Sequence, residues 1–145
     1  MDAQQELQKI MYQSEVYKNQ IEAINEQISM VNMTIKSMES AIEAMTSVNK
    51  TGVETEILLP LSSNAFVRSK LSDNQNVIVG IGANIFFEKP IPDAIKFFDA
   101  QLEELHAALD KMQKKSAEIE TNLIKLNEVG EQMMKEAQGQ GQMQI

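Results

Sequence analysis

The stretch that decides the fold is residues 7–45, LQKIMYQSEVYKNQIEAINEQISMVNMTIKSMESAIEAM. Apolar or near-apolar residues recur along it at steps that alternate between three and four, and only Ser14 is plainly polar. These positions, the first stripe, are Leu7, Ile10, Ser14, Tyr17, Ile21, Ile24, Ile28, Val31, Ile35, Met38, Ile42 and Met45. Such a heptad stripe is typical of a helix that packs lengthwise against another helix in a coiled coil. Because the stretch contains no Gly and no Pro, it predicts one unbroken helix, over about residues 5–48.

A second stripe with the same spacing lies nearer the C-terminal end of the sequence. Its residues are Ile95, Phe98, Leu102, Leu105, Leu109, Met112, Ser116, Ile119, Leu123, Leu126, Gly130 and Met133. Two stripes of equal length in one chain favour an antiparallel helical hairpin. If Met45 lies beside Ile95, paired positions sum to about 140, and Ile10 then meets Gly130. A register one heptad away remains compatible with the same pattern.

Between the stripes, residues 53–89 change to short β-branched and aromatic runs that are broken by turn residues. The runs are 53–59, closed by Pro60, then 65–71, 77–79 and 85–89, with turn residues at 62–64 and 73–76. They predict four short strands in two hairpins. Proline is tolerated in a first helical turn, so Pro92 opens the second helix, predicted over about residues 93–136. The polar, Gln- and Gly-rich residues 138–145 predict a disordered tail.

The sequence therefore predicts one domain, residues 1–145, of the α+β class and mostly α. Its architecture is a long antiparallel coiled-coil hairpin with two β-hairpins inserted between the helices. The formal net charge of −8 and the pI near 4.7 argue against partners that are nucleic acids or anionic membrane surfaces. There is no cysteine, no apolar run long enough to cross a membrane, and no signal-like start, which together favour a cytoplasmic location.

No catalytic, cofactor-binding or metal-binding constellation is found in the sequence. The single histidine, His106, has no Cys or carboxylate cluster around it in the sequence and is expected at the surface. Gly80 and Gly82 resemble the start of a dinucleotide loop, but Ile85 stands where the third glycine belongs and a strand follows. We therefore expect no enzyme activity and no cofactor.

The helix ends farthest from the β insert differ from the rest of the stripes. Ser14 and Gly130 stand where large apolar residues would pack, while Met11 and Met134 lie just outside the stripes. A surface rich in flexible Met side chains can contact many different apolar sequences. The alternative is an ordinary, loosely packed coiled-coil end, or a contact of these methionines with a neighbouring chain.

The order of helix, four-strand insert and returning helix resembles the alpha class of the prefoldin family, of the archaeal type. The segment 56–61 followed by Ala65 and Phe66 resembles the family's strand, proline, turn and phenylalanine sequence. The segments 77–83 and 87–89 resemble its second hairpin, and 92–98 resembles the start of its second helix. An insert long enough for two hairpins favours the alpha class, and alpha-like subunits of eukaryotes share the pattern.

The resemblance implies an ATP-independent co-chaperone that holds unfolded or nascent polypeptides and passes them to a group II chaperonin. Two alpha and four beta subunits would join through their hairpins in an intersubunit β-barrel. The implied client-contacting tip is Leu7, Ile10, Met11, Met133 and Met134. The implied subunit-assembly residues are Ile57, Leu59, Phe66, Val67, Val77, Val79, Ile85 and Phe87. The alternative from another class is a structural scaffold or filament that assembles through its β-strand edges without binding clients.

Overall fold

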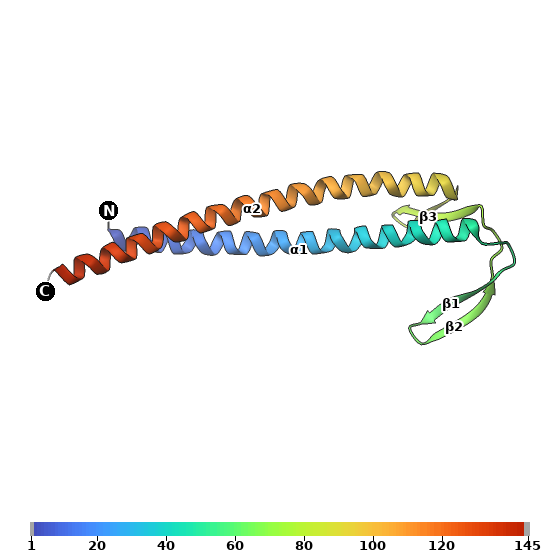
Figure 1. Ribbon diagram of the computed structural model, residues 1–145, viewed down its shortest axis with the longest axis horizontal. Coiled ribbons are helices and arrows are strands. Elements are labelled where there is room, and N and C mark those ends of the chain that lie inside the picture. Colours follow the sequence, from blue (N-terminus) through green and yellow to red (C-terminus); the bar gives the residue numbers. More distant parts are fainter. Residues whose placement is uncertain (1, 144–145) are drawn as a thin grey trace. The chain divides into compact units, whose positions relative to one another are not determined.

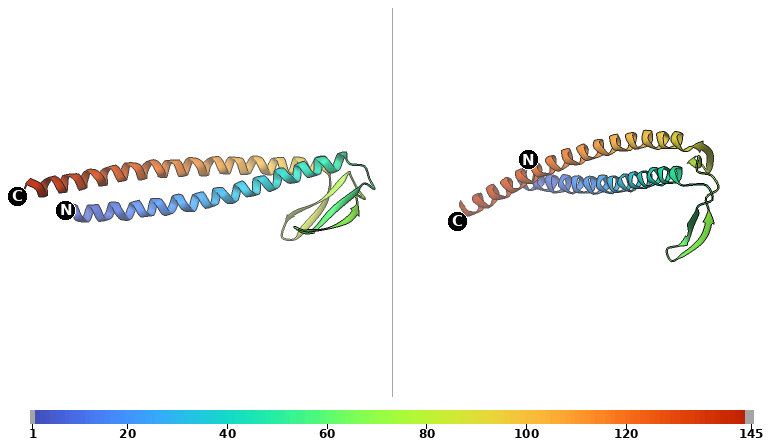
Figure 2. Two further views of the ribbon diagram at one scale, coloured as in Figure 1. Left: turned by 60° about the horizontal axis from the view of Figure 1, so that its bottom comes forward. Right: turned by 45° about the vertical axis from the view of Figure 1, so that its right-hand side comes forward.

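The computed structural model describes residues 2–143, which form two long helices and four short strands (Figure 1). Their bounds are Ala3–Lys50 for α1, Glu56–Ser62 for β1, Ala65–Lys70 for β2, Asn76–Gly82 for β3, Ile85–Pro90 for β4 and Ile91–Met143 for α2. β1 pairs with β2 and β3 pairs with β4, each pair antiparallel (Figure 2). The predicted fold class, two long helices around two inserted β-hairpins, is confirmed.

Both helices begin earlier than predicted, for local reasons. Asp2 precedes α1, and its carboxylate accepts the backbone N–H of Gln4 at 3.3 Å, which satisfies one of the free donors of the first turn. Ile91 is already helical, because Pro92 follows in the first turn and the N–H of Ile91 donates to the carbonyl of Gln75 at 2.9 Å. A sequence pattern finds the helix but not these capping contacts.

The C-terminal part of α2 corrects the prediction of a disordered tail. The helix was expected to end near residue 136, yet it runs to Met143, so residues 138–143 are helical. Gln is a good helix former, and extending an existing helix requires no new nucleus. Residues 144 and 145, also predicted disordered, lie outside the described residues.

The chain divides into two units, and both helices contribute to each. Unit 1 comprises Met1–Asn32 and Ala107–Ile145, and unit 2 comprises Met33–His106. Every residue of the first and second stripes is buried or half-buried, as the heptad pattern predicts. In unit 1 the helices run antiparallel, and a Cβ built on Gly130 would lie 3.3 Å from Cγ2 of Ile10. This neighbourhood confirms the register in which paired positions sum to about 140.

The core of unit 2 lies where α1 ends, α2 begins and β3 packs against both helices. Met45, Val79, Ile91 and Ala94 are buried, and Ile91 and Ala94 are fully inaccessible to solvent. Around them pack the partly buried side chains of Ile42, Val48, Val77, Ile95, Phe97 and Phe98. No residue of β1 or β2 belongs to this core. The second hairpin is therefore anchored to its own helices, and the first is not.

The anchored hairpin has one face toward the helices and one face toward solvent. Val77 pairs with Lys89 and Val79 with Phe87, so these four side chains share a face. The ammonium of Lys89 lies 4.5 Å from the ring centre of Phe97 on α2, a cation–π contact.

The opposite face of the anchored hairpin carries Ile78 and Phe86, which are exposed. The Phe86 ring covers Gly80, its cross-strand partner, where an added Cβ would lie 3.0 Å from the ring. The hairpin closes through Ala83 and Asn84, both at positive φ, in the tight turn that matches strand twist.

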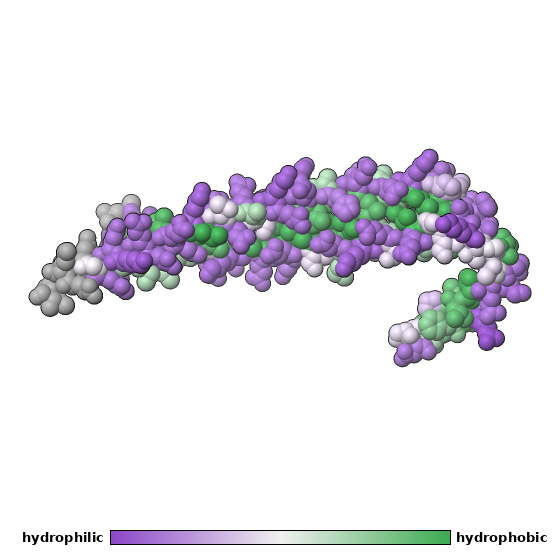
Figure 3. Space-filling view, in the orientation of Figure 1, coloured by the Kyte–Doolittle hydropathy of each residue, from purple (hydrophilic) through white to green (hydrophobic). Residues whose placement is uncertain are grey.

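The β1–β2 hairpin is apolar on both faces and covered on neither. Leu59 pairs with Val67 on one face, and Phe66 pairs with Pro60 on the other, and all four are exposed. Figure 3 shows a green, apolar band along this hairpin beside hydrophilic residues in purple. Pro60 was expected to close the first strand, but β1 continues to Ser62 with a register shift between Pro60 and Ser62. A two-stranded sheet has only edge strands, where a proline without an N–H is tolerated.

A short turn joins the two hairpins and is tied to the end of α1. The Asp73 carboxylate accepts the N–H groups of Gln75 at 2.8 Å and Asn76 at 3.1 Å. These hydrogen bonds lower the pKa of Asp73 from its ordinary value of 3.8. The side-chain amide of Asn74 donates to the carbonyl of Thr51 at 2.9 Å. The turn thus positions β3 next to the helices.

Burial predicts a large loss of stability at one isoleucine of unit 2 and a small loss at another when each is replaced by alanine. Ile91→Ala removes a fully buried side chain and should lower the free energy of unfolding by about 2–5 kcal/mol. Ile78→Ala, at a side chain that is 75% exposed, should change it by less than about 1 kcal/mol. Denaturant unfolding followed by circular dichroism measures both. Equal losses would contradict the described core.

The turn at Asp73 predicts that the difference in stability between wild type and Asp73→Ala depends on pH. Because the folded-state pKa of Asp73 is lower than the unfolded one, its carboxylate stabilises the fold fully above pH 3.8. That stabilisation is lost as the pH falls through the lowered pKa. Asp73→Ala should therefore unfold at lower denaturant concentration than wild type at neutral pH, and the difference should vanish in acid. The exposed Asp99→Ala controls for removal of a charge, and a pH-independent difference would refute the turn's role.

Candidate functional site

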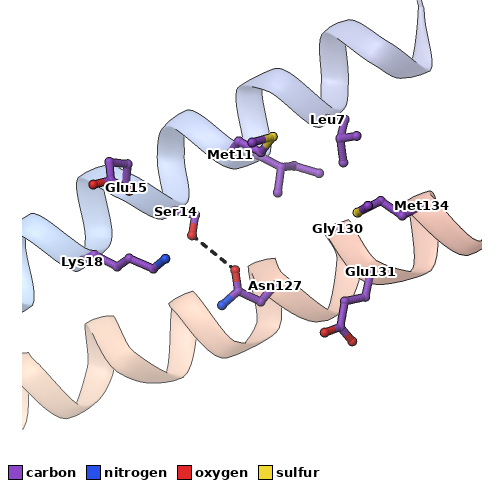
Figure 4. Close-up of a pocket in the computed structure, with 10 residues that line it drawn as sticks. Leu7, Met11, Ser14, Glu15, Lys18, Asn127, Gly130, Glu131 and Met134 are labelled. Carbon is purple, nitrogen blue, oxygen red and sulfur yellow. Dashed lines mark hydrogen bonds between the residues drawn. The ribbon is translucent and has the colours of Figure 1, made fainter.

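A groove lies between α1 and α2 in unit 1, where Gly130 supplies no side chain (Figure 4). Its volume is about 360 Å³. The residues that line it, here called the tip groove, are Leu7, Ile10, Met11, Ser14, Glu15, Lys18, Asn127, Gly130, Glu131 and Met134. A large side chain at Gly130 would close this space against Ile10, which is why the interruption of the second stripe matters.

One end of the tip groove is apolar and partly open to solvent. Leu7 and Ile10 are half-buried, whereas Met11 is 65% and Met134 is 51% exposed. The unbranched thioether chains of Met11 and Met134 can adjust their rotamers to the shape of a bound group. This end of the groove therefore presents an apolar surface that its own helices leave uncovered.

The other end of the tip groove is polar. The hydroxyl of Ser14, only 8% exposed, donates to the side-chain carbonyl of Asn127 at 3.2 Å. The amide nitrogen of Asn127 is turned away from Ser14, and Lys18 extends toward the same end (Figure 4). The groove thus joins an apolar half to a half that holds hydrogen-bond donors.

Four of the five side chains expected at the client-contacting tip lie together in the tip groove: Leu7, Ile10, Met11 and Met134. The fifth, Met133, lines a neighbouring hollow of about 370 Å³ that also includes Leu7. Sequence reasoning missed the polar lining residues Glu15, Lys18, Asn127 and Glu131. Their spacing was the available signal, because they follow the stripes on the flank that carries Met11 and Met134.

The residues expected at subunit contacts differ in how deeply they are buried. Leu59, Phe66, Val67, Ile85 and Phe87 are exposed, and Ile57 and Val77 are half-buried. Val79 is only 3% exposed and belongs to the core of unit 2, so its side chain serves the fold of the chain itself. Exposed apolar hairpin residues that the sequence did not single out are Leu58, Leu61, Ile78, Ile81 and Phe86.

Residues 2–143 contain no group of three or more His, Cys, Asp or Glu side chains arranged to hold a metal ion. No helix within this range has the length and apolar character needed to cross a membrane.

Comparison with known proteins places this geometry in a family. The family model described as "Prefoldin subunit" matches residues 17–137, which span both units. Prefoldin subunit alpha of Methanococcus aeolicus is 31% identical over 104 residues, covering 72% of this chain and 70% of the relative. Prefoldin subunit alpha of Pyrococcus horikoshii is 27% identical over 119 residues, covering 81% and 80% of the two chains.

A solved structure shares the fold. The cryo-EM structure of filamentous PFD from Methanocaldococcus jannaschii matches with a TM-score of 0.68 at 24% identity, covering 77% of this chain and 93% of that one. The family match, the alpha-subunit relatives and the shared arrangement of two helices around two hairpins agree. The chain belongs to the prefoldin family of chaperone subunits and is of the alpha type.

Proposed function

We propose that this chain is a subunit of an ATP-independent co-chaperone that captures unfolded or nascent polypeptides and delivers them to a group II chaperonin. Membership of the prefoldin family makes it a chaperone subunit that assembles with other prefoldin subunits. The observation that carries the finer proposal is the tip groove of unit 1, a hollow whose apolar end is bordered by two exposed methionines.

The tip groove suits a holding function better than an enzymatic one. An unfolded polypeptide exposes apolar side chains of many shapes, and burying each one stabilises a complex by roughly 1.5–3 kcal/mol. Met11 and Met134 can adapt to such a range of shapes. Holding and releasing a chain through such contacts requires no nucleotide. The acidic surface, with a net charge of −8, fits a cytoplasmic protein without nucleic acid partners.

The hairpins are the proposed site of assembly with beta subunits, in a complex of two alpha and four beta chains. The β1–β2 hairpin has apolar side chains on both faces and free edges, and these are features of strands that are completed by another chain. In the proposal, the residues that contact partner strands in a shared β-barrel are Ile57, Leu59, Phe66, Val67, Val77, Ile85 and Phe87. Val79 is assigned to the chain's own core instead.

A second candidate is a scaffold or filament that assembles through its strand edges and binds no client. The similarity of the fold to an archaeal protein solved as a filament supports keeping it. Sedimentation of the chain alone and with a beta-type subunit separates the two. A discrete complex that forms only with the partner supports the chaperone, while open-ended polymers of this chain alone support the scaffold.

The proposed capture site predicts a loss of client binding when its methionines are replaced. Met11→Ser/Met134→Ser should weaken binding of an unfolded polypeptide about a hundredfold, because each of the two covered Met side chains contributes about 1.5 kcal/mol. Both side chains are exposed, so the stability of the helices should change little. Suppression of aggregation of a chemically unfolded protein, measured by light scattering without ATP, reports the effect.

Met33→Ser is the matched control for that prediction, since Met33 is 69% exposed on α1 but lies outside the tip groove. It should protect the unfolded protein as well as wild type does. If the double variant also protects as wild type does, the tip groove is not the capture site.

The proposed assembly surface predicts that a charge on either face of the β1–β2 hairpin prevents complex formation. Leu59→Lys and Phe66→Lys each place an ammonium where a partner would cover it, at a cost of several kcal/mol. Ile124→Lys, at an apolar residue 53% exposed on α2, is the control and should still assemble. Native mass spectrometry after co-expression with a beta-type subunit measures the outcome. Normal complexes from both hairpin variants would contradict the assignment.

A further inference from the structure

We infer that the tip groove binds one peptide unit of an unfolded chain together with its apolar side chain. The apolar half takes the side chain, and the polar half, built by Ser14 and Asn127, takes the main-chain amide. This inference rests on the proposed capture of unfolded polypeptides and adds what the site recognises. Its occupant is an extended polypeptide segment with a large apolar residue.

The hydrogen bond between Ser14 and Asn127 leaves specific groups free. The hydroxyl of Ser14 uses its proton on the carbonyl of Asn127 at 3.2 Å and keeps its own lone pairs. Among the described residues, the amide nitrogen of Asn127 makes no hydrogen bond, and it is turned away from Ser14 in Figure 4. The polar half therefore offers N–H donors from Asn127 and an acceptor on Ser14.

These free groups complement a peptide bond. A main-chain carbonyl accepts from an N–H of Asn127, and a main-chain N–H donates to the oxygen of Ser14. A chain that inserts an apolar side chain into a groove also desolvates the neighbouring peptide group, which costs free energy unless that group finds partners. A groove lined only by apolar residues would leave that peptide group unpaired.

Charge in the groove favours the same orientation. The ammonium of Lys18 extends toward the polar end of the groove, while the carboxylates of Glu15 and Glu131 point outward (Figure 4). A positive charge at the end that holds the N–H donors complements the partial negative charge of a carbonyl oxygen. A carboxylate accepts hydrogen bonds in the same way, so the test distinguishes binding of a main-chain carbonyl from binding of a carboxylate.

The testing variant is Asn127→Asp in the full-length chain, assembled with its partner subunits. It keeps the shape of the side chain and an oxygen that accepts from Ser14, and it removes both N–H donors. The first probe is an uncharged peptide of alternating Leu and Ser with both ends blocked, so its main chain is the only source of amide groups. The second probe is an uncharged apolar dye without an amide. Fluorescence titration measures both affinities.

Asn127→Asp should bind the blocked peptide about fivefold more weakly than wild type, the loss expected for one net hydrogen bond, and should bind the dye equally well. Asn19→Asp, the same change at an exposed site outside the groove, should leave both affinities unchanged. Ser14→Ala/Asn127→Ala, which removes both partners at once, is the second variant and should show the same selective loss.

Three results would overturn the inference. Unchanged peptide binding by both variants would mean that the polar pair does not contact the main chain. Equal losses for peptide and dye would mean that the pair only shapes the groove. Binding of the same Leu and Ser peptide only when its C-terminal carboxylate is left unblocked would make the polar half a carboxylate-binding site. A wild-type complex that binds no peptide at all would instead refute the proposed capture function itself.

Discussion

The burial of the two heptad stripes is the interaction on which the rest of the structure depends. The stripes alternate steps of three and four without a break, so each helix keeps one narrow apolar face turned inward. Charged residues that usually select a partner chain are scarce beside the first stripe. The connection through the β insert makes such charged residues unnecessary, because it brings the two stripes of one chain together in a single register. The neighbourhood of Ile10 and Gly130 shows that register directly.

The core of unit 2 explains why the two hairpins differ in how they are anchored. Val79 packs with Met45, Ile91 and Ala94, and this contact anchors the β3–β4 hairpin to the helices through one of its faces. The β1–β2 hairpin contributes nothing to that core and retains apolar side chains on both faces. An isolated two-stranded hairpin is marginally stable in water. The β1–β2 hairpin is therefore the one whose apolar faces lack cover within the chain, while the β3–β4 hairpin is anchored to the helices.

Much of the fold followed from the sequence because periodicity is a local property. The stripes, the four strands and the inward position of Ser14 and Gly130 could all be predicted from spacing. The burial of Val79 could not, because alternation in β3 shows which residues share a face but not which face meets the helices. The end of the first strand was wrongly predicted at Pro60, because a proline is tolerated inside a strand that lies at the edge of a sheet.

The sequence predicted that the heptad stripes are interrupted at the tip, but it did not predict the polar contacts that form there. The gaps left by Ser14 and Gly130 and the neighbouring methionines stood out against a regular stripe. The hydrogen bond from Ser14 to Asn127 could not be predicted, because it depends on the rotamer of a side chain just beside the stripe. The helical segment 138–143 was likewise missed, because its composition favours solvation while its neighbours already form a helix.

The gaps that Ser14 and Gly130 leave in the stripes have an energetic cost. A glycine inside a helix costs about 1 kcal/mol relative to alanine, and a buried hydroxyl adds a penalty unless it is bonded. Both sit within one stretch of unit 1, at Gly130 and Ser14, and Asn127 satisfies the hydroxyl. Closing the groove with large apolar residues would strengthen the coiled coil and remove the hollow. The residues at these two positions therefore lower the stability of the helix pair at the place where they leave an open, partly polar surface.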